Sequence, residues 1–334
     1  MTYQTNNIIQ ASDFNTFALG SSTGLPNNTT PNINSVLGVG YGNMGYGQTS
    51  LASVAVNDTV SASNWADLTS SMSRGSLHQN SSLGVFTTPL SEALITYLPN
   101  LSTNISTVYN NRLNARAQGT STTYQSINVG STIASSWTNT LTHTFKVTFE
   151  SGDKARYFFN SGGQLKFSVS HSGSGALNSM FSELAHDIGT LSLSAPIIGT
   201  SKIGLVSYTG LTQTGFENES YINPNWRPVY NTNYGYYALN TTNQTIFKEI
   251  ATAESPSYAI YGNSYVSLSA KSNGTQGANG DTGNILIFSI VWGLVPSGTQ
   301  ITGTSTANCT VVQPEVTYLT NSWGTVNVLS LIHI

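Results

Sequence analysis

The run TFKVTFE, residues 144–150, alternates apolar and polar side chains without interruption, and a period of two residues indicates a β-strand with one buried face. ARYFFN, at 155–160, predicts a second strand, and QLKFSVS, at 164–170, alternates like the first run. The intervening SGDK and SGG have the composition of tight turns. We therefore predict a three-stranded antiparallel meander that forms the centre of a β domain.

Four side chains of this meander are expected in the core: Phe145, Phe149, Leu165 and Phe167. One helix is predicted within the β region, at 176–188, where apolar residues recur at helical spacing before Gly189. Further strands are predicted at 203–208, 234–239, 246–251, 258–261, 265–270, 285–295, 309–312 and 326–332. Their even spacing favours a mainly β fold, with an antiparallel β-sandwich or jelly-roll-like body and a few short helices concentrated in the N-terminal part.

The N-terminal part has helical patterns instead. We expect a short helix at 12–18, a second one from about residue 63, and a third within 88–118. The second helix should bury Trp65, Leu68 and Met72, and the third should bury Leu101, Ile105 and Val108. Because residues 119–128 are polar, we place a boundary there. Residues 1–118 are interpreted as an attachment segment and residues 119–334 as the β-rich body.

A glycine-rich loop, residues 38–48, lies between the first two predicted helices and contains G-x-G-x-x-G. Its surroundings exclude a dinucleotide-binding turn, because no helix opens directly after it and no strand with an acidic residue follows at the right distance. The loop has no charged residue and little core of its own. We therefore predict that it becomes ordered against another subunit, with Tyr41 and Tyr46 as assembly contacts.

Charged residues make up only 7% of the 334 residues, and the formal net charge is −3, whereas ordinary soluble proteins carry roughly 25% charged residues. The chain has no basic stripe, so nucleic acid is not an expected partner. No apolar stretch approaches the length of a membrane span. Cys309 is the single cysteine, which excludes an intrachain disulfide and a cysteine-based metal cage.

Two groups of acidic residues are candidates for a catalytic or metal site. Glu183 and Asp187 are spaced i, i+4 on the predicted helix beside His186, but like charges at this spacing are also typical of a solvated helix face. Glu217 and Glu219 resemble the carboxylate pair of a glycoside hydrolase only in residue type. We therefore expect no enzyme, no catalytic or metal-binding residue and no cofactor.

Aromatic residues gather between Asn and Pro in residues 221–237. Aromatic rings with amide neighbours are suited to stacking on sugars or to a protein interface, and the alternative is that they cover the β core. The candidate ligand or interface aromatics are Tyr221, Trp226, Tyr230, Tyr234, Tyr236 and Tyr237.

Several segments, in order along most of the chain, resemble virion structural proteins of tailed bacteriophages, especially contractile-tailed phages of cyanobacteria and other marine bacteria. They are IQASDFN (9–15), GYGQ (45–48), WADLTSSMSRGSLHQ (65–79), ARYFFNSGG (155–163) and TYLTNSWG (317–324). The section after residue 189 shows little of this resemblance. The resemblance implies a particle component of the tail, baseplate, neck or fibre, located in the virion.

The resulting functional hypothesis is a structural subunit that acts through protein–protein assembly, with copies of itself and neighbouring virion proteins as partners. The low charge agrees with it, because interface centres are depleted in charge and enriched in aromatic residues. The alternative is a receptor- or carbohydrate-binding adhesin of the phage tail, with a glycan of the host surface as partner. A polysaccharide depolymerase of the tail is a third possibility.

Overall fold

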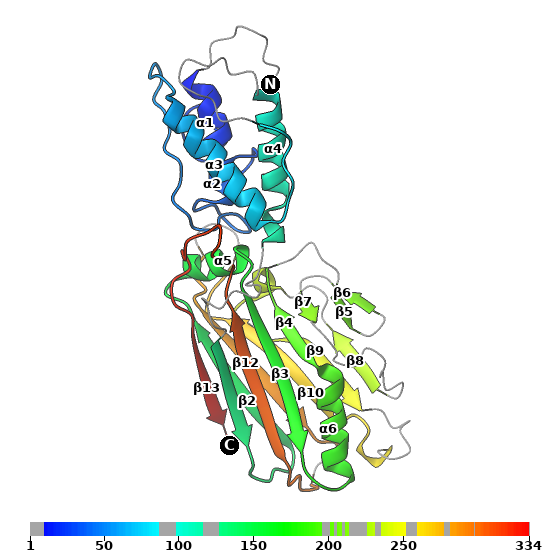
Figure 1. Cartoon of the computed structure of the whole chain (residues 1–334). Coiled ribbons are helices and arrows are strands. Elements are labelled where there is room, and N and C mark those ends of the chain that lie inside the picture. Colours follow the sequence, from blue (N-terminus) through cyan, green and yellow to red (C-terminus); the bar gives the residue numbers. More distant parts are fainter. Residues whose placement is uncertain are drawn as a thin grey trace.

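The computed structural model describes residues 10–86, 98–115, 127–195, 201–203, 206–208, 211–213, 226–230, 235–251, 259–276, 281–296 and 298–333. Two antiparallel sheets pack together, and most of the six described α-helices lie in the N-terminal half (Figure 1). Helix and strand content are roughly equal. The predicted antiparallel sheets and N-terminal helices are confirmed, but the chain is mixed α/β, so the prediction of a mainly β chain was wrong.

The N-terminal helices share one apolar cluster at the end of the β body (Figure 1). They are α1 (Ala11–Leu19), α2 (Ile33–Val36), α3 (Ala62–His78) and α4 (Leu98–Asn110), with the short turn η1 (Arg112–Asn114) after them. Ser61 caps α3, and Gly20 ends α1 in the left-handed conformation. The six side chains predicted to face this core on α3 and α4 are all buried. The predicted boundary at residues 118 and 119 lies outside the described residues.

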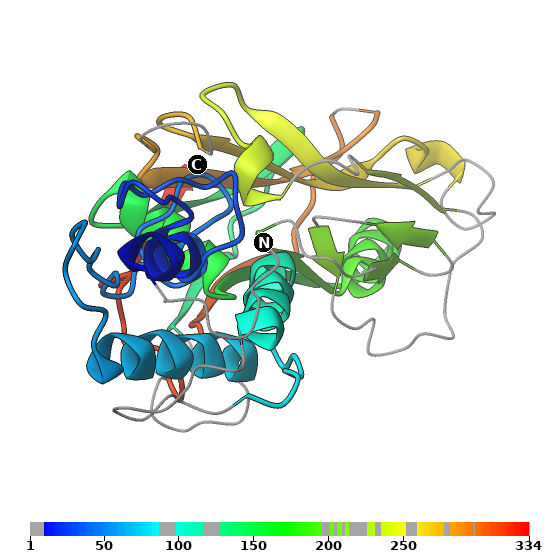
Figure 2. The ribbon, with the colours of Figure 1, turned by 90° about the horizontal axis from the view of Figure 1, so that it is seen from above.

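The body consists of two sheets, seen as separate layers in Figure 2. The five-stranded sheet has the order β1 (Ile127–Ile133), β12 (Thr304–Val312), β3 (Gln164–Ser172), β4 (Thr190–Leu193) and β7 (Leu211–Gln213). The six-stranded sheet has the order β13 (Asn327–His333), β2 (Thr140–Thr148), β11 (Ile285–Gly293), β10 (Tyr265–Ser272), β9 (Gln244–Ala251) and β8 (Trp226–Tyr230). A separate pair is formed by β5 (Ser201–Ile203) and β6 (Val206–Tyr208).

The predicted meander is wrong in its middle element and in its pairing. ARYFFN belongs to helix α5 (Gly152–Asn160), because Ser151 caps it by accepting a hydrogen bond from the Lys154 amide. In this helix Ala155, Phe158 and Phe159 face the core. Within only six residues, this spacing of apolar side chains cannot be told apart from that of a buried strand. The helix carries the chain from one sheet to the other, so β2 and β3 lie in different layers.

The predicted core residues of this region are nevertheless confirmed. Phe145, Phe149, Leu165 and Phe167 are at most 1% exposed. The ring centroids of Phe145 and Phe167 lie 6.3 Å apart, and those of Phe167 and Phe288 lie 4.5 Å apart. Alternation therefore identified the buried faces correctly, although these faces meet across the core and are not neighbours in one sheet.

Elsewhere in the body most of the predicted elements are found, and two predicted strands are not. Helix α6 spans Ala176–Ile188, as predicted. The predicted strands at 246–251, 265–270, 285–295, 309–312 and 326–332 correspond to β9, β10, β11, β12 and β13. Two short predicted strands are wrong, because they contain the 3₁₀ turns η2 (Tyr236–Ala238) and η3 (Ala259–Tyr261). The predicted linker ends inside β1, whose inward residues include Ile133 and the polar Ser131.

Two buried histidines form hydrogen bonds inside the sandwich. His171 Nε2 lies 2.8 Å from Asn178 Oδ1, so this nitrogen donates, and Nδ1 lies 2.9 Å from Ser305 Oγ. Asn178 belongs to α6, so this network fixes the helix to β3 and β12. His143 Nδ1 lies 2.9 Å from Ser131 Oγ and bridges the two sheets. Burial lowers the pKa of His143 to about 4 and lowers that of His171.

Phe167→Ala should lower the free energy of unfolding by about 3–5 kcal/mol, because it removes a fully buried ring from between the two sheets. Urea denaturation of the purified chain measures this difference. Lys166→Ala, on the outward face of the same strand, is the matched control and should change stability by no more than about 0.5 kcal/mol. Equal effects of the two substitutions would contradict the assignment of Phe167 to the core.

Candidate interaction sites

The glycine-rich loop of residues 38–48 is the junction between the helical part and the β body. Arg156 Nη1 donates to the carbonyl oxygens of Val39 and Met44 at 2.7 and 2.6 Å. Asn160 Nδ2 donates to the carbonyl oxygens of Gly42, Met44 and Gly45 at 3.1–3.2 Å. A Cβ atom at Gly45 would lie 2.5 Å from the Val39 carbonyl oxygen, so this approach requires glycine.

Arg156 is the charged centre of this junction. Its Nε lies 2.9 Å from Asp281 Oδ2, and both side chains are 3% exposed. Its Nη2 lies 3.0 Å from the more exposed Asp153 Oδ1. The guanidinium group therefore joins the loop to α5 and to the connection between β10 and β11.

A C-terminal segment, residues 313–326, runs from the body back to the helical part. Leu319 is buried in the helical cluster, whereas Trp323 is buried in the core of the body. Gln48 Nε2 donates to the Thr320 carbonyl oxygen, and Gln48 Oε1 accepts from the Thr320 amide, both at 2.9 Å. Arg74 Nε donates to the Tyr318 carbonyl oxygen at 3.1 Å. This segment is a second connection between the two parts.

The two tyrosines predicted as assembly contacts lie in different environments. Tyr46 is 1% exposed, donates to the Arg112 carbonyl oxygen at 2.6 Å and accepts from Gln79 Nε2 at 2.9 Å. Burial raises the pKa of its phenol well above the usual value. Tyr41 is 55% exposed. The loop is thus ordered by its own chain, and only Tyr41 presents its ring to the surroundings.

The candidate aromatic residues of segment 221–237 also lie in different environments. Tyr236 is fully buried and stacks on Phe159 with centroids 4.2 Å apart. Tyr237 donates to the Gly42 carbonyl oxygen at 2.8 Å and to Asn160 Oδ1, so it belongs to the junction. Trp226 and Tyr230 lie on β8, at an edge of the six-stranded sheet. Tyr221 and Tyr234 lie outside the described residues.

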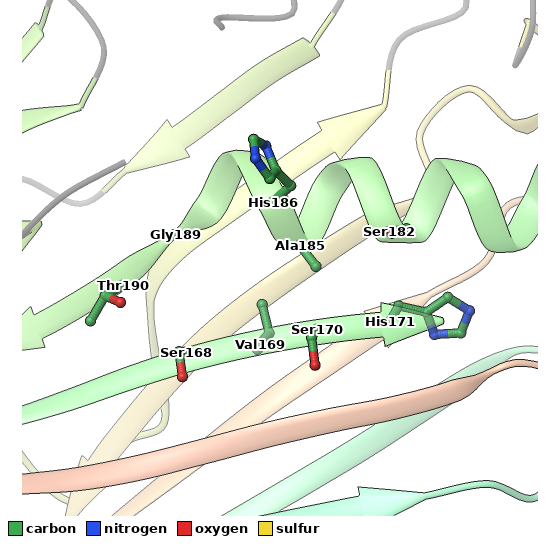
Figure 3. A pocket seen from close by; sticks show the side chains of 9 residues that line it. All are labelled: Ser168, Val169, Ser170, His171, Ser182, Ala185, His186, Gly189 and Thr190. Atoms are coloured by element: carbon green, nitrogen blue, oxygen red, sulfur yellow. The ribbon is translucent and has the colours of Figure 1, made fainter. Parts of the chain in front are cut away.

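A pocket of about 460 Å³ lies between β3 and α6 (Figure 3). It forms where β4 stops pairing with β3, because that ladder ends at Ser168 and Thr190. Val169 and Ala185 point toward each other across it, whereas His186 points away from β3 (Figure 3). The lining therefore combines the apolar Val169 and Ala185 with serine, threonine and histidine residues, and neither the position of the pocket nor its lining was predicted from the sequence.

Two buried carboxyl groups lie near this pocket. Asp187, 8% exposed, has Oδ1 3.6 Å from His186 Nδ1, and burial raises its pKa to about 6. Glu249 on β9 is 6% exposed. Burial raises the pKa of Glu249 to about 8, and the charge of Asp187 contributes to this shift. Glu249 could have been found from the sequence, because it occupies an inward position between Phe247 and Ala251.

With a pKa of about 8, the Glu249 carboxyl group retains its proton at neutral pH. Among the described residues no three His, Cys, Asp or Glu side chains lie together as metal ligands. Glu183 is half-buried on α6. Glu217 and Glu219 lie outside the described residues. The two carboxyl groups therefore differ in charge at neutral pH, since Asp187 is mostly ionised and Glu249 is mostly protonated.

No family model matches this chain, and comparisons with curated proteins and with solved structures found no match either. Within the described ranges, no helix has both the length and the apolar character needed to cross a lipid bilayer.

Arg156→Met should lower the free energy of unfolding by about 3–5 kcal/mol, because it leaves the buried Asp281 carboxylate without its cation. Urea denaturation at neutral pH measures the loss. The double variant with Asp281→Asn should be less destabilised than the sum of the two single variants. Strict additivity in this cycle would contradict the ion pair.

Stability should fall between pH 6.5 and 8 by at most about 2 kcal/mol, because a raised folded-state pKa at Glu249 means that the folded chain binds this proton more tightly than the unfolded chain. His143 and His171 act with the opposite sign, but their lowered pKa values confine that effect to lower pH. Thermal unfolding at several pH values should show that Glu249→Gln removes the fall above pH 6.5. An unchanged profile would contradict the burial of this carboxyl group.

Proposed function

We propose that this chain is a structural subunit of a tailed-bacteriophage virion, as a component of the tail, baseplate, neck or fibre, and that it acts by assembly with other subunits. The observation that carries the proposal is the outward face of the six-stranded sheet. Leu329 and Leu331 are 57% and 37% exposed there, and three aliphatic side chains of β11 share the face. These are Ile285, Ile287 and Val291.

The charge of this face supports a protein partner. Lys146, Lys271 and Lys248 point outward from β2, β10 and β9, and the described outward positions of these strands and of β11 and β13 include no Asp or Glu. A face with aliphatic residues, hydroxyl groups and unopposed lysines is complementary to a subunit surface that carries carboxylates around an apolar centre.

The alternative function, a carbohydrate-binding adhesin, is favoured by a different observation. The pocket between β3 and α6 has a volume within the range of small-molecule sites. The outward face of the five-stranded sheet nearby carries hydroxyl and amide groups, including Thr306 and Asn308 of β12 and Ser170 of β3. Binding of the purified chain to a glycan array would support the adhesin, and its absence would leave assembly as the function.

We further infer that the body is a jelly-roll-like variant. Strands β1, β2 and β3 lie alternately in the two sheets, and so do β11 and β12, as consecutive strands do in a jelly roll. Strands β8 to β11 instead form a simple meander. The proposed function involves no catalytic step and no cofactor.

Lys146→Glu combined with Lys271→Glu should reduce incorporation into particles at least tenfold, because it places carboxylates where the proposed partner has its own. Mass spectrometry of purified virions from cells expressing the variant measures incorporation. Lys166→Glu, on the outward face of the other sheet, is the matched control and should be incorporated normally. Absence of the unmodified chain from virions would overturn the proposal.

Tyr41→Ala should also lower incorporation, with little change in melting temperature, because this exposed ring is available to a neighbouring subunit. Tyr46→Ala should lower the melting temperature through the loss of a buried ring and two hydrogen bonds. Differential scanning calorimetry combined with virion mass spectrometry separates the two effects. Normal incorporation of Tyr41→Ala would remove this tyrosine from the assembly surface.

A further inference from the structure

Strand β13 forms an edge of the six-stranded sheet, with β1 of the other sheet beside it. It pairs with β2 in an unbroken register from Asn327 to His333, and no other described strand pairs with its far side. Figure 1 shows β13 as the outermost strand on one long side of the body. Proteins usually protect such edges with a charge, a proline or a bulge, since free backbone groups can pair with another chain. NVLSLIH, the sequence of β13, has none of these features.

The exposed side chains of β13 are apolar and uncharged, as is typical of a contact surface. Leu329 and Leu331 lie on the outward face with more than a third of each side chain exposed. The neighbouring edge strand β1, which lies beside β13, also carries no charged residue. Exposed leucines on an uncharged edge strand are typical of a surface that another copy covers.

We propose that two copies of this chain form a dimer in which their β13 strands pair antiparallel about a two-fold axis at Ser330. Ser330 is the middle residue of β13, so this register pairs the whole strand. Each Leu329 then lies opposite the partner's Leu331 on the same face, and such directly opposed apolar pairs stabilise antiparallel strands. The two six-stranded sheets become one continuous sheet, and the two-fold axis closes the assembly at two copies.

The hydroxyl group of Ser330 supports this register. In the described part of one copy, Ser330 Oγ is buried and has no hydrogen-bond partner. A buried hydroxyl group without a partner is unfavourable. On the two-fold axis the two Ser330 side chains lie directly opposite each other, and each hydroxyl group becomes the partner of the other.

The charges nearby permit the contact. Lys146 is the nearest lysine across the β13–β2 ladder, opposite Leu329. In the dimer, the two copies of Lys146 would be separated by three strand spacings, about 14 Å. This distance exceeds the screening length of about 8 Å at physiological salt, so their repulsion is weak.

This inference rests on the proposed function, since it specifies one contact of the assembly, but it is tested on the purified chain alone. Sedimentation equilibrium over a range of concentrations should show a monomer–dimer equilibrium. Leu329→Lys and Leu331→Lys should each weaken dimerisation at least tenfold without changing the melting temperature. Val56→Lys, at a more exposed apolar position in the helical part, is the control and should dimerise normally.

The position of the axis is tested by Leu329→Cys with a short bismaleimide crosslinker, because Leu329 is exposed and would lie diagonally across the axis from its own copy, at about 7–8 Å. The native Cys309 is buried, so the new thiol should give a crosslinked dimer, whereas Val56→Cys should not. A chain that stays monomeric at all concentrations, or lysine variants that dimerise like the native chain, would overturn the proposal. Normal virion incorporation of such a monomeric chain would leave the assembly function intact and remove only the β13 contact.

Discussion

A buried cation determines how the parts of this chain fit together. Arg156 has almost no contact with solvent, and a charge removed from water is tolerated only where opposite charges and hydrogen bonds replace its hydration. Asp281 and Asp153 provide the charges, and two carbonyl groups of the glycine loop provide hydrogen bonds. Since these partners come from three different segments, satisfying one guanidinium group positions the helical part, α5 and the β10–β11 connection together.

The crossing of the chain from β2 through α5 to β3 explains which parts of the fold were predictable. Alternation in a strand reports which side chains are buried, and it did so for Phe145 and Phe167. It does not report the sheet to which the strand belongs, because that depends on the connection. The ARYFFN segment was ambiguous over six residues, whereas the longer stripe of α6 defined that helix from Ala176 to Ile188.

The candidate sites were less predictable, for related reasons. A loop has no periodicity, so Tyr41 and Tyr46 looked equivalent although one is exposed and the other is buried. The pocket depends on where β4 stops pairing with β3, which is a tertiary feature. Glu249 is the exception, because a carboxylate at an inward strand position is visible in the alternation itself. The edge of β13 likewise required the strand order, since its sequence alone suits an internal strand.

The C-terminal segment that joins the two parts also has a consequence during synthesis. Gln48 makes its reciprocal hydrogen bonds with Thr320, which is 272 residues later in the chain, so at about 5–20 residues per second the ribosome needs between about 15 and 55 s to supply the partner. Leu319 reaches the helical cluster at the same late stage. The first helices therefore emerge long before Leu319 can join their apolar cluster, and the nascent helical part lacks this contact until residue 319 has left the ribosome.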